Sequence, residues 1–300
     1  MELVKLLKAN PALIVKELEK QDWTILHTIE SELLFKEWVF TDKISKLTSL
    51  HKDEVNYRLG NLEKKGLVTR KEQGYMLLNS GLDSISLKAF ASKQQISAIG
   101  KVIGVGKEAE VYEAISENGT EYAIKFYRIG RISFRNIKRT RNYSSSASTH
   151  RWIQMSIQAA KNEFQAMSTL LDHKVSVPQV ISRERHAILM TRFEGVKLAD
   201  VSQLEDPKSL LENILTNIKI AYTQCGLINS DLSEFNILFN GKDISLIDWP
   251  QVVDRHHLNS DSLLDRDILN ILRFFKKRFG LDYNQEAAYF FVRGWRSTLF

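Results

Sequence analysis

Two short stretches in the second half of the chain carry the most specific pattern in the sequence: Asp231-Leu232-Ser233-Glu234-Phe235-Asn236-Ile237-Leu238 and Ser245-Leu246-Ile247-Asp248-Trp249-Pro250-Gln251. In the first, Asp231 lies five residues before Asn236, which leads into an apolar pair; in the second, an apolar run ends on Asp248. Carboxylate and amide oxygens are hard ligands, which Mg²⁺ binds together with phosphate oxygens. An Asp or Asn can equally cap a turn, so neither stretch establishes a cation site by itself.

A glycine-containing stretch lies upstream, between two predicted strands. It reads Gly104-Val105-Gly106-Lys107-Glu108 and leads through Ala109 to Val111. Glycines at this spacing let the backbone approach a phosphate closely, and Lys107 adds positive charge. The stretch lacks the third glycine of a dinucleotide fingerprint and the helix of a Walker loop, so alone it indicates a hairpin turn.

A lysine follows on the next predicted strand, Tyr122-Ala123-Ile124-Lys125. A lysine whose ammonium is withdrawn from water needs a partner. Glu163, at the edge of an apolar helical stripe, is a candidate for that partner. Two unrelated surface charges are the alternative interpretation.

The four motifs occur in the order found in protein kinases. There the strand lysine holds the phosphates of ATP, the loop Asp orients the acceptor and takes its proton, and the Asn and second Asp hold Mg²⁺. We therefore expect an ATP–Mg²⁺ site, with Mn²⁺ as an alternative ion. Only fifty-two residues follow Asp248, which leaves room for two or three helices but not for an activation segment and a peptide platform.

The first eighty or so residues predict a winged-helix domain. Helices are expected from Asn10-Pro11 to Glu19, from a cap at Asp22, from Thr41 or Asp42, and over His51–Lys65, followed by a hairpin with Lys71–Gly74 at its turn. The expected recognition helix offers the nucleic-acid candidates Lys52, Arg58, Lys64 and Lys65. A solvated face or a protein-docking module is the alternative.

The rest of the chain alternates between strand and helix patterns. Strands are expected at Val102–Val105, Val111–Ile115, Tyr122–Tyr127, Val180 and Ile188–Thr191, and helices at Arg151–Leu171, Leu210–Cys225, Asp265–Phe279 and Asn284–Trp295. The predicted class is α+β, with a winged helix over 1–84, a linker helix over 85–95 and a bilobal kinase-like domain over 96–300. Its lobes are expected at about 96–190 and 194–300.

A basic segment between Phe126 and Arg151 carries no acidic residue. We expect it to be mobile and to contact a phosphate backbone, unless it is simply solvated. Its candidate contacts are Arg131, Arg135, Lys138, Arg139 and Arg141, in a run that also includes Arg128.

Composition adds broad limits. The chain has 300 residues, 43% hydrophobic and 26% charged, which excludes a collagen-like or largely disordered chain. A net charge of +6 favours a polyanionic partner. The single Cys225 suits a reducing cytosol, and the sequence contains neither an apolar secretion segment nor a membrane-spanning run, so we expect a cytoplasmic protein without a membrane partner.

Together these motifs resemble the RIO-type atypical protein kinases, specifically the archaeal-like subfamily with an N-terminal winged helix. The likeness is carried by Gly104–Glu108, Arg131–Arg135, Asp231–Asn236, Ile247–Gln251, Asp265–Ile268 and, in the wing, Gly74–Leu77 with Asn79-Ser80-Gly81, and it runs from about residue 10 to 280. Asn229-Ser230 stand where this family usually has His-Gly, and Ala109 stands where it commonly has Ser. We expect the first change to alter loop packing without removing Asp231, and the second to weaken contacts to the triphosphate.

The resemblance implies a serine/threonine kinase or ATPase that acts in small-ribosomal-subunit maturation, with rRNA or a pre-ribosomal particle as partner and with autophosphorylation. It also implies a hinge at Met190–Phe193 against the adenine, Leu238 and Ile247 around the base, and Asp248 as a transient phosphoryl acceptor. Two alternatives stay open: a non-catalytic ATP-binding scaffold on pre-ribosomes, and a DNA-binding regulator with a kinase-like sensor domain.

Overall fold

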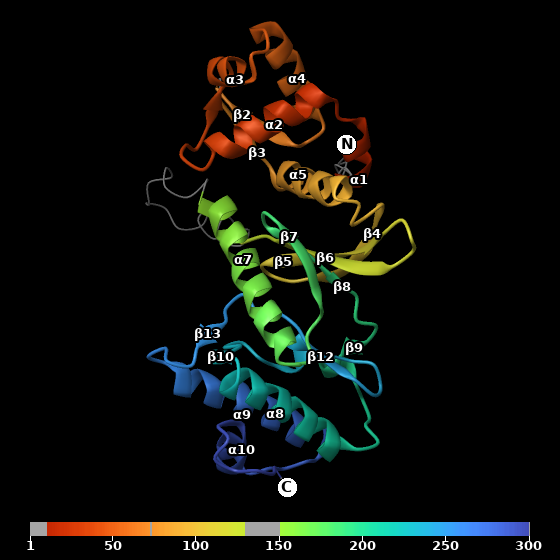
Figure 1. Ribbon diagram of the computed structural model, residues 1–300, viewed down its shortest axis with the longest axis vertical. Coiled ribbons are helices and arrows are strands. Elements are labelled where there is room, and N and C mark those ends of the chain that lie inside the picture. The colour runs from red at the N-terminus through yellow and green to blue at the C-terminus, as the bar shows by residue number, and fades with distance from the viewer. Residues whose placement is uncertain (1–10, 73, 130–150, 300) are drawn as a thin grey trace, which may run out of the picture. The chain divides into compact units, whose positions relative to one another are not determined.

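The computed structural model describes residues 11–72, 74–129 and 151–299 (Figure 1). The chain divides into two compact units. The first contains Met1–Gln158 with Arg183–Ile188, and the second contains Ala159–Ser182 with Leu189–Phe300. The boundary therefore passes through one long helix and two strands. Within the described ranges, no helix is long and apolar enough to cross a membrane.

The predicted winged helix forms the first part of the first unit. Its helices are α1 (Pro11–Glu17), α2 (Lys20–Glu32), α3 (Thr41–Thr48) and α4 (Lys52–Lys64), and its hairpin strands are β2 (Val68–Lys71) and β3 (Gly74–Leu77). A short strand that the sequence pattern did not reveal, β1 (Val39–Phe40), pairs with β3, which gives the sheet order β1-β3-β2.

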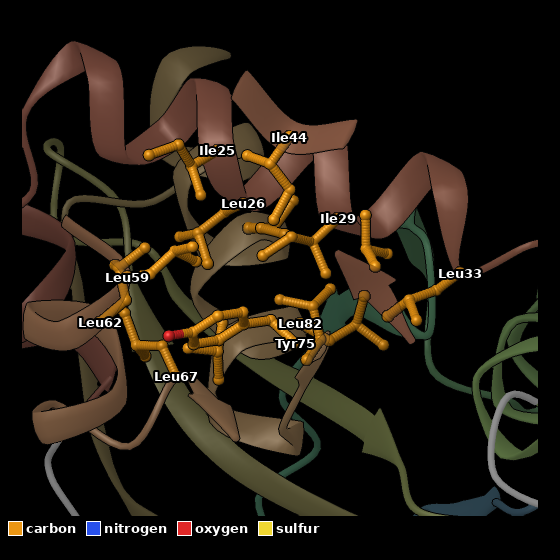
Figure 2. Packing of buried hydrophobic residues seen from close by; sticks show 14 of the residues in the cluster. Ile25, Leu26, Ile29, Leu33, Ile44, Leu59, Leu62, Leu67, Tyr75 and Leu82 are labelled. Carbon is orange, nitrogen blue, oxygen red and sulfur yellow. The ribbon is translucent and has the colours of Figure 1, made fainter. Parts of the chain in front are cut away.

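Apolar side chains spaced along α2 and α4 point into one core (Figure 2). Ile25, Leu26 and Ile29 of α2 and Leu59 of α4 are wholly buried there. The helical spacing of these apolar residues in the sequence therefore corresponds to one buried face on each helix. The start of α2 differs from the prediction: Glu19 is the N-cap and Asp22 is its reciprocal partner, three residues into the helix, in a capping box.

Helix α5 (Asn79–Ser92) packs as part of this core and not as a free linker. Leu82 and Ile85 belong to the same buried cluster as α2 and α4. A Cβ on Gly81 would lie 2.2 Å from the Leu67 carbonyl oxygen, so only glycine lets α5 approach the start of the hairpin this closely. The helix therefore crosses residue 84, where the sequence pattern predicted the domain to end.

A five-stranded sheet follows in the order β4-β5-β6-β8-β7. Its strands are β4 (Ala98–Val105), β5 (Ala109–Ile115), β6 (Glu121–Tyr127), β7 (Val180–Glu184) and β8 (Ala187–Thr191), which confirms each predicted strand and lengthens it. Helix α7 (Arg151–Asp172) also matches its predicted range. Trp152 and Ile153, in its first turn, join the core of the winged helix.

The second unit is mostly helical. Helices α8 (Pro207–Thr223), α9 (Ser260–Phe279) and α10 (Gln285–Val292) form its body. A small sheet has the order β12-β11-β9, from β9 (Val196–Lys197), β11 (Ile237–Phe239) and β12 (Ile244–Leu246). A two-stranded sheet pairs β10 (Leu227–Ile228) with β13 (Val253–Asp254), and short 3-10 turns η1 (Leu198–Asp200) and η2 (Glu234–Asn236) complete the unit.

Candidate active site

The glycine stretch is the tip of the β4–β5 hairpin in the first unit. The Gly106 N–H donates to the Ala109 carbonyl at 2.8 Å, which closes the turn over the exposed Lys107 and Glu108. Ala109 opens β5, so the position where the resembled family commonly has Ser contributes no hydroxyl to the tip. The pattern's prediction of a hairpin turn is confirmed.

Lys125 lies in register with this hairpin. Gly104 pairs with Val111 across β4 and β5, and Val111 pairs with Lys125 across β5 and β6, so the three residues form one row. Lys125 is only 7% exposed, and its Nζ lies 5.1 Å from the centroid of the Tyr127 ring. Ala123, also buried, is two residues earlier on β6. The sheet therefore places a withdrawn ammonium in line with the glycine turn.

A buried ionic cluster lies at the end of the same strand. The Arg128 side chain donates to both carboxylate oxygens of Asp83 on α5, each at 2.8 Å, and to Glu110 on β5 at 3.3 Å. His186 also contacts Asp83, at 2.8 Å. Burial lowers the pKa of His186, although the hydrogen bond to Asp83 opposes that effect. The backbone N–H of Arg128 donates to the Glu108 carbonyl at 2.6 Å. Arg128 is thus an internal residue, in contrast to the sequence pattern that placed it in the basic run.

Asn236 and Asp248 lie at one end of a hairpin in the second unit. Ile237 of β11 pairs with Leu246 of β12, and one step beyond them the Ile247 N–H donates to the Asn236 carbonyl at 2.9 Å. Asp248 is the next residue, and its backbone is left-handed, with φ of +70°. The register therefore brings the two predicted metal ligands to neighbouring positions, and their binding of a metal ion stays a prediction.

The Asn236 amide has a fixed orientation. Its Nδ2 donates to the Asp231 carbonyl at 3.0 Å, which leaves the amide oxygen as the atom that can face a cation. Among the described residues, no group of three or more His, Cys, Asp or Glu side chains forms a metal site. Mg²⁺ does not need one, because it is held by one or two protein oxygens with water and phosphate oxygens. The donor set therefore fits Mg²⁺ bound with a nucleotide.

Helix α9 holds the backbone on both sides of Asp231. Buried Asp267 accepts the N–H groups of Ser230 at 2.8 Å and Leu232 at 3.2 Å. Arg266 donates to the Ser230 carbonyl, and Asn270 donates to the Leu232 carbonyl at 3.1 Å. Burial raises the pKa of Asp267 to about 6, against the opposing effect of those two N–H donors. Asp231 itself is exposed, so its carboxylate is available while its backbone is fixed.

These residues of α9 were not predicted as part of the site. A signal existed, because Asp267 and Asn270 interrupt the buried stripe of Leu264, Ile268 and Ile271 at helical spacing. Polar residues on a buried helical face need partners, and here the partners are backbone groups of the loop.

Glu163 lies on α7, buried to 1% exposure. Its Oε1 accepts the backbone N–H of Trp249 at 2.7 Å. Glu163 therefore contacts the stretch that carries Asp248, a role that the sequence pattern did not predict. Its predicted pairing with Lys125 stays a prediction.

The residues expected around an adenine base belong to the second unit. Met190 ends the buried part of β8, and Phe193 lies in the segment that leads to β9. A Cβ on Gly195 would lie 2.8 Å from the Phe239 carbonyl oxygen, so this segment runs closely against β11. Leu238 and Ile247 lie on that same small sheet or directly after it, and both are half-buried.

The nucleic-acid candidates separate into different environments. Arg58 contacts Glu19, Asp22 and Glu54, each at 3.0 Å, with 13% of its side chain exposed, so it does not lie on an open basic face. Lys52 pairs with Asp42 at 2.6 Å and Lys65 pairs with Glu17, whereas Lys64 is exposed. Arg131, Arg135, Lys138, Arg139 and Arg141 lie outside the described residues.

The fold and this set of residues define a protein-kinase-like phosphotransferase domain that follows a winged helix. Sequence comparison agrees: the RIO domain matches residues 110–288, and the Rio2 N-terminal domain matches residues 15–93. The chain belongs to the RIO family of atypical serine/threonine protein kinases.

Individual relatives show the same relationship. The chain is 39% identical over 248 residues to the RIO-type serine/threonine-protein kinase Rio2 of Methanocaldococcus jannaschii, which covers 80% of this chain and 91% of that protein. It is 34% identical over 277 residues to the serine/threonine-protein kinase rio2 of Dictyostelium discoideum, or 91% of this chain and 53% of that protein. The crystal structure of the Rio2 kinase–ADP/Mg²⁺–phosphoaspartate complex from Chaetomium thermophilum matches with a TM-score of 0.81 and 31% identity, over 92% of this chain and 87% of that one.

Proposed function

We propose that the chain binds ATP with Mg²⁺ and transfers the γ-phosphoryl group to a hydroxyl or carboxylate acceptor. The observation that carries this proposal is the arrangement around Asn236, whose amide oxygen is left to face a cation beside Asp248, while α9 holds the backbone on both sides of Asp231. The ADP/Mg²⁺ complex of the Chaetomium relative supports the choice of nucleotide and ion.

Each residue has a role that its position supports. Lys125 would bind the α- and β-phosphates, with Glu163 as its partner, and the Gly104–Glu108 turn would cover the phosphates. Asn236 and Asp248 would hold Mg²⁺, which supplies charge neutralisation on the β- and γ-phosphate oxygens when bound. Met190, Phe193, Leu238 and Ile247 would enclose the adenine.

Asp231 is the proposed base. When a hydroxyl oxygen of the acceptor attacks the γ-phosphorus, a new O–P bond forms, the bond to the β–γ bridging oxygen breaks, and ADP carries away that electron pair. The acceptor's proton passes to the Asp231 carboxylate and then to water. For a carboxylate acceptor no proton is transferred, and the phosphoaspartate of the Chaetomium relative supports Asp248 as that acceptor here.

The partner proposed for this activity is rRNA of the small ribosomal subunit, in a pre-ribosomal particle in the cytoplasm. The net charge of +6 and the winged helix support a polyanionic partner. A competition-binding experiment distinguishes rRNA from DNA as the partner: at the same salt concentration, duplex DNA should displace bound rRNA only weakly.

The test of the activity is the Asp231→Ala variant, assayed for ADP formation and for autophosphorylation with labelled ATP. We expect phosphoryl transfer to serine and threonine hydroxyls, and the ADP formation that accompanies it, to fall by about two to four orders of magnitude, because the base is lost, while ATP affinity stays within about threefold. Transfer to the Asp248 carboxylate needs no base and should be retained. Wild-type turnover in this variant would exclude the base role. Absence of turnover in the wild-type chain, with ATP bound, would instead support the non-catalytic scaffold.

A further inference from the structure

Asn229 connects the loop that carries Asp231 with the stretch that carries Asp248. Its side chain is buried, with 4% exposure. Its Nδ2 donates to the Asp248 carbonyl at 2.9 Å, and its Oδ1 accepts the backbone N–H of Asp231 at 3.1 Å. One amide thus bonds to the backbones of both residues and uses its donor and acceptor ends separately.

Ser230 makes a second connection between the same two stretches. Its Oγ donates to the Gln251 carbonyl at 2.6 Å. Its φ is +64°, in the left-handed region that disfavours a residue with a Cβ and suits glycine. A glycine here would avoid that strain but could not bond to Gln251. With serine at this position, the chain has the hydrogen bond to Gln251 and accepts the strain of a left-handed φ that glycine would avoid.

These bonds control how Asp248 is presented. The Asp248 carbonyl and the Trp249 N–H belong to one peptide group; Asn229 bonds to the carbonyl and Glu163 accepts the N–H at 2.7 Å. Since both ends of this group are held, it cannot rotate without breaking a buried hydrogen bond. Its orientation fixes ψ of Asp248, whose φ is a left-handed +70°, and so fixes the direction of the Cα–Cβ bond from which the carboxylate extends.

We propose that Asn229 and Ser230 are positioning residues for the cation site: their side-chain bonds to Asp248 and Gln251, together the Asn229–Ser230 brace, hold the Asp248 carboxylate in the orientation that binds Mg²⁺ with nucleotide. The proposal rests on the function proposed above. It assigns a role to the two positions where this chain departs from the His-Gly of the resembled family.

The test measures binding of a non-hydrolysable ATP analogue to the full chain by calorimetry, with saturating Mg²⁺ and again in EDTA. The ratio of the two dissociation constants, here called the Mg²⁺ ratio, reports how much the ion contributes to the affinity for the nucleotide. In Asn229→Ala, we expect the dissociation constant of the analogue measured with Mg²⁺ to rise about tenfold, which corresponds to the loss of one buried hydrogen bond. The dissociation constant measured in EDTA should stay within about twofold of the wild-type value. Ser230→Ala keeps the Cβ and removes only the hydroxyl, so it should act in the same direction by about threefold.

Asn240→Ala is the matched control. Asn240 lies at the other end of the β11–β12 hairpin, where its Oδ1 accepts the N–H groups of Lys242 and Asp243 at 3.0 and 2.7 Å. The control loses two side-chain bonds in the same hairpin without touching the brace, and it should retain the wild-type Mg²⁺ ratio. Asn229→His, which restores a ring N–H donor, should recover most of the ratio that Asn229→Ala loses.

Three outcomes decide the matter. A wild-type Mg²⁺ ratio in both Asn229→Ala and Ser230→Ala overturns the brace. An equal loss of affinity with and without Mg²⁺ also overturns it, because it shows general loop damage. If Asp248→Asn too leaves the Mg²⁺ ratio unchanged, the proposed cation site fails, and the brace fails with it for that separate reason. If Asn229→Ala does not fold, Ser230→Ala alone decides: a wild-type Mg²⁺ ratio overturns the brace, and a ratio reduced about threefold supports it.

Discussion

Asn229 and Glu163 hold opposite ends of one peptide group, the group that joins Asp248 to Trp249. Asn229 Nδ2 donates to its carbonyl at 2.9 Å, and Glu163 Oε1 accepts its N–H at 2.7 Å. One side chain comes from the loop before Asp231 and the other from α7, nearly seventy positions earlier in the chain. The presentation of Asp248 therefore depends on two distant segments, and each of them can be tested by substitution.

Removal of the Lys125 ammonium should weaken nucleotide binding. In Lys125→Met the length and apolar stem are kept, so the sheet should remain folded while the charge for the phosphates is lost. We expect ATP affinity to fall about ten- to a hundredfold, in line with a charge-assisted contact of about 1.5–3 kcal/mol. Titration of a fluorescent ATP analogue measures it. Affinity at the wild-type level would show that Lys125 does not contact the phosphates.

The cluster of Asp83, Arg128 and His186 should be costly to break. Asp83→Ala leaves the Arg128 guanidinium buried without its bidentate partner, and removal of one member of a buried pair costs about 3–5 kcal/mol. Urea unfolding at pH 7 should show this loss, whereas Asp243→Ala, at an exposed turn, should change stability by about 0.5 kcal/mol or less. Equal stability of the two variants would contradict the importance of the cluster.

Asp267 should give unfolding free energy a characteristic pH dependence. Burial raises its folded pKa to about 6, above the ordinary 3.8, so the folded state binds more protons between these values. The contribution of this group to stability is therefore present at low pH and is lost as the pH rises from about 4 to about 6, by on the order of 2–3 kcal/mol in all.

Asp267→Asn removes this titration. The free energy of unfolding of the variant, measured in urea at pH 4, 5 and 6, should lack that component of the pH dependence. At pH 7 turnover should also fall by about tenfold, because one of the two N–H groups beside Asp231 loses its acceptor. Identical pH profiles for variant and wild type would show that the Asp267 pKa is not raised.

The exposed lysines of α4 and the enclosed Arg58 should behave differently toward RNA. If α4 contacts phosphates, Lys64→Ala should weaken rRNA binding modestly and reduce the salt dependence by about one phosphate contact. Arg58→Ala should act mainly on stability, because its guanidinium is held by Glu19, Asp22 and Glu54. Filter binding at several salt concentrations, with urea unfolding of each variant, separates the two effects. A larger binding loss for a stably folded Arg58→Ala would reverse this assignment.

Local spacing along the chain was enough to predict the helices and strands and the order of the motifs that carry the proposed site residues. Periodic apolar residues predicted the buried faces of α2 and α4, and strand patterns with turns predicted the β4–β5–β6 ladder that aligns Gly104, Val111 and Lys125. The closeness of Asn236 and Asp248 also follows from local spacing, because a tight turn between two apolar runs brings the outer ends of those runs together. All these features depend on short-range spacing, which the sequence displays directly.

The hydrogen-bond and ion-pair partners of the charged residues, in contrast, follow from tertiary packing. Asp83 meets Arg128, Asp267 meets the backbone around Asp231, and Arg58 is enclosed by Glu19 and Asp22. In each case the partners are far apart in the chain. From the sequence alone, each of these charged residues fits an exposed, solvated position as well as a buried ion pair. Hydrogen bonds and ion pairs of this kind form only after packing has brought the segments together and removed water, so no local pattern specifies them.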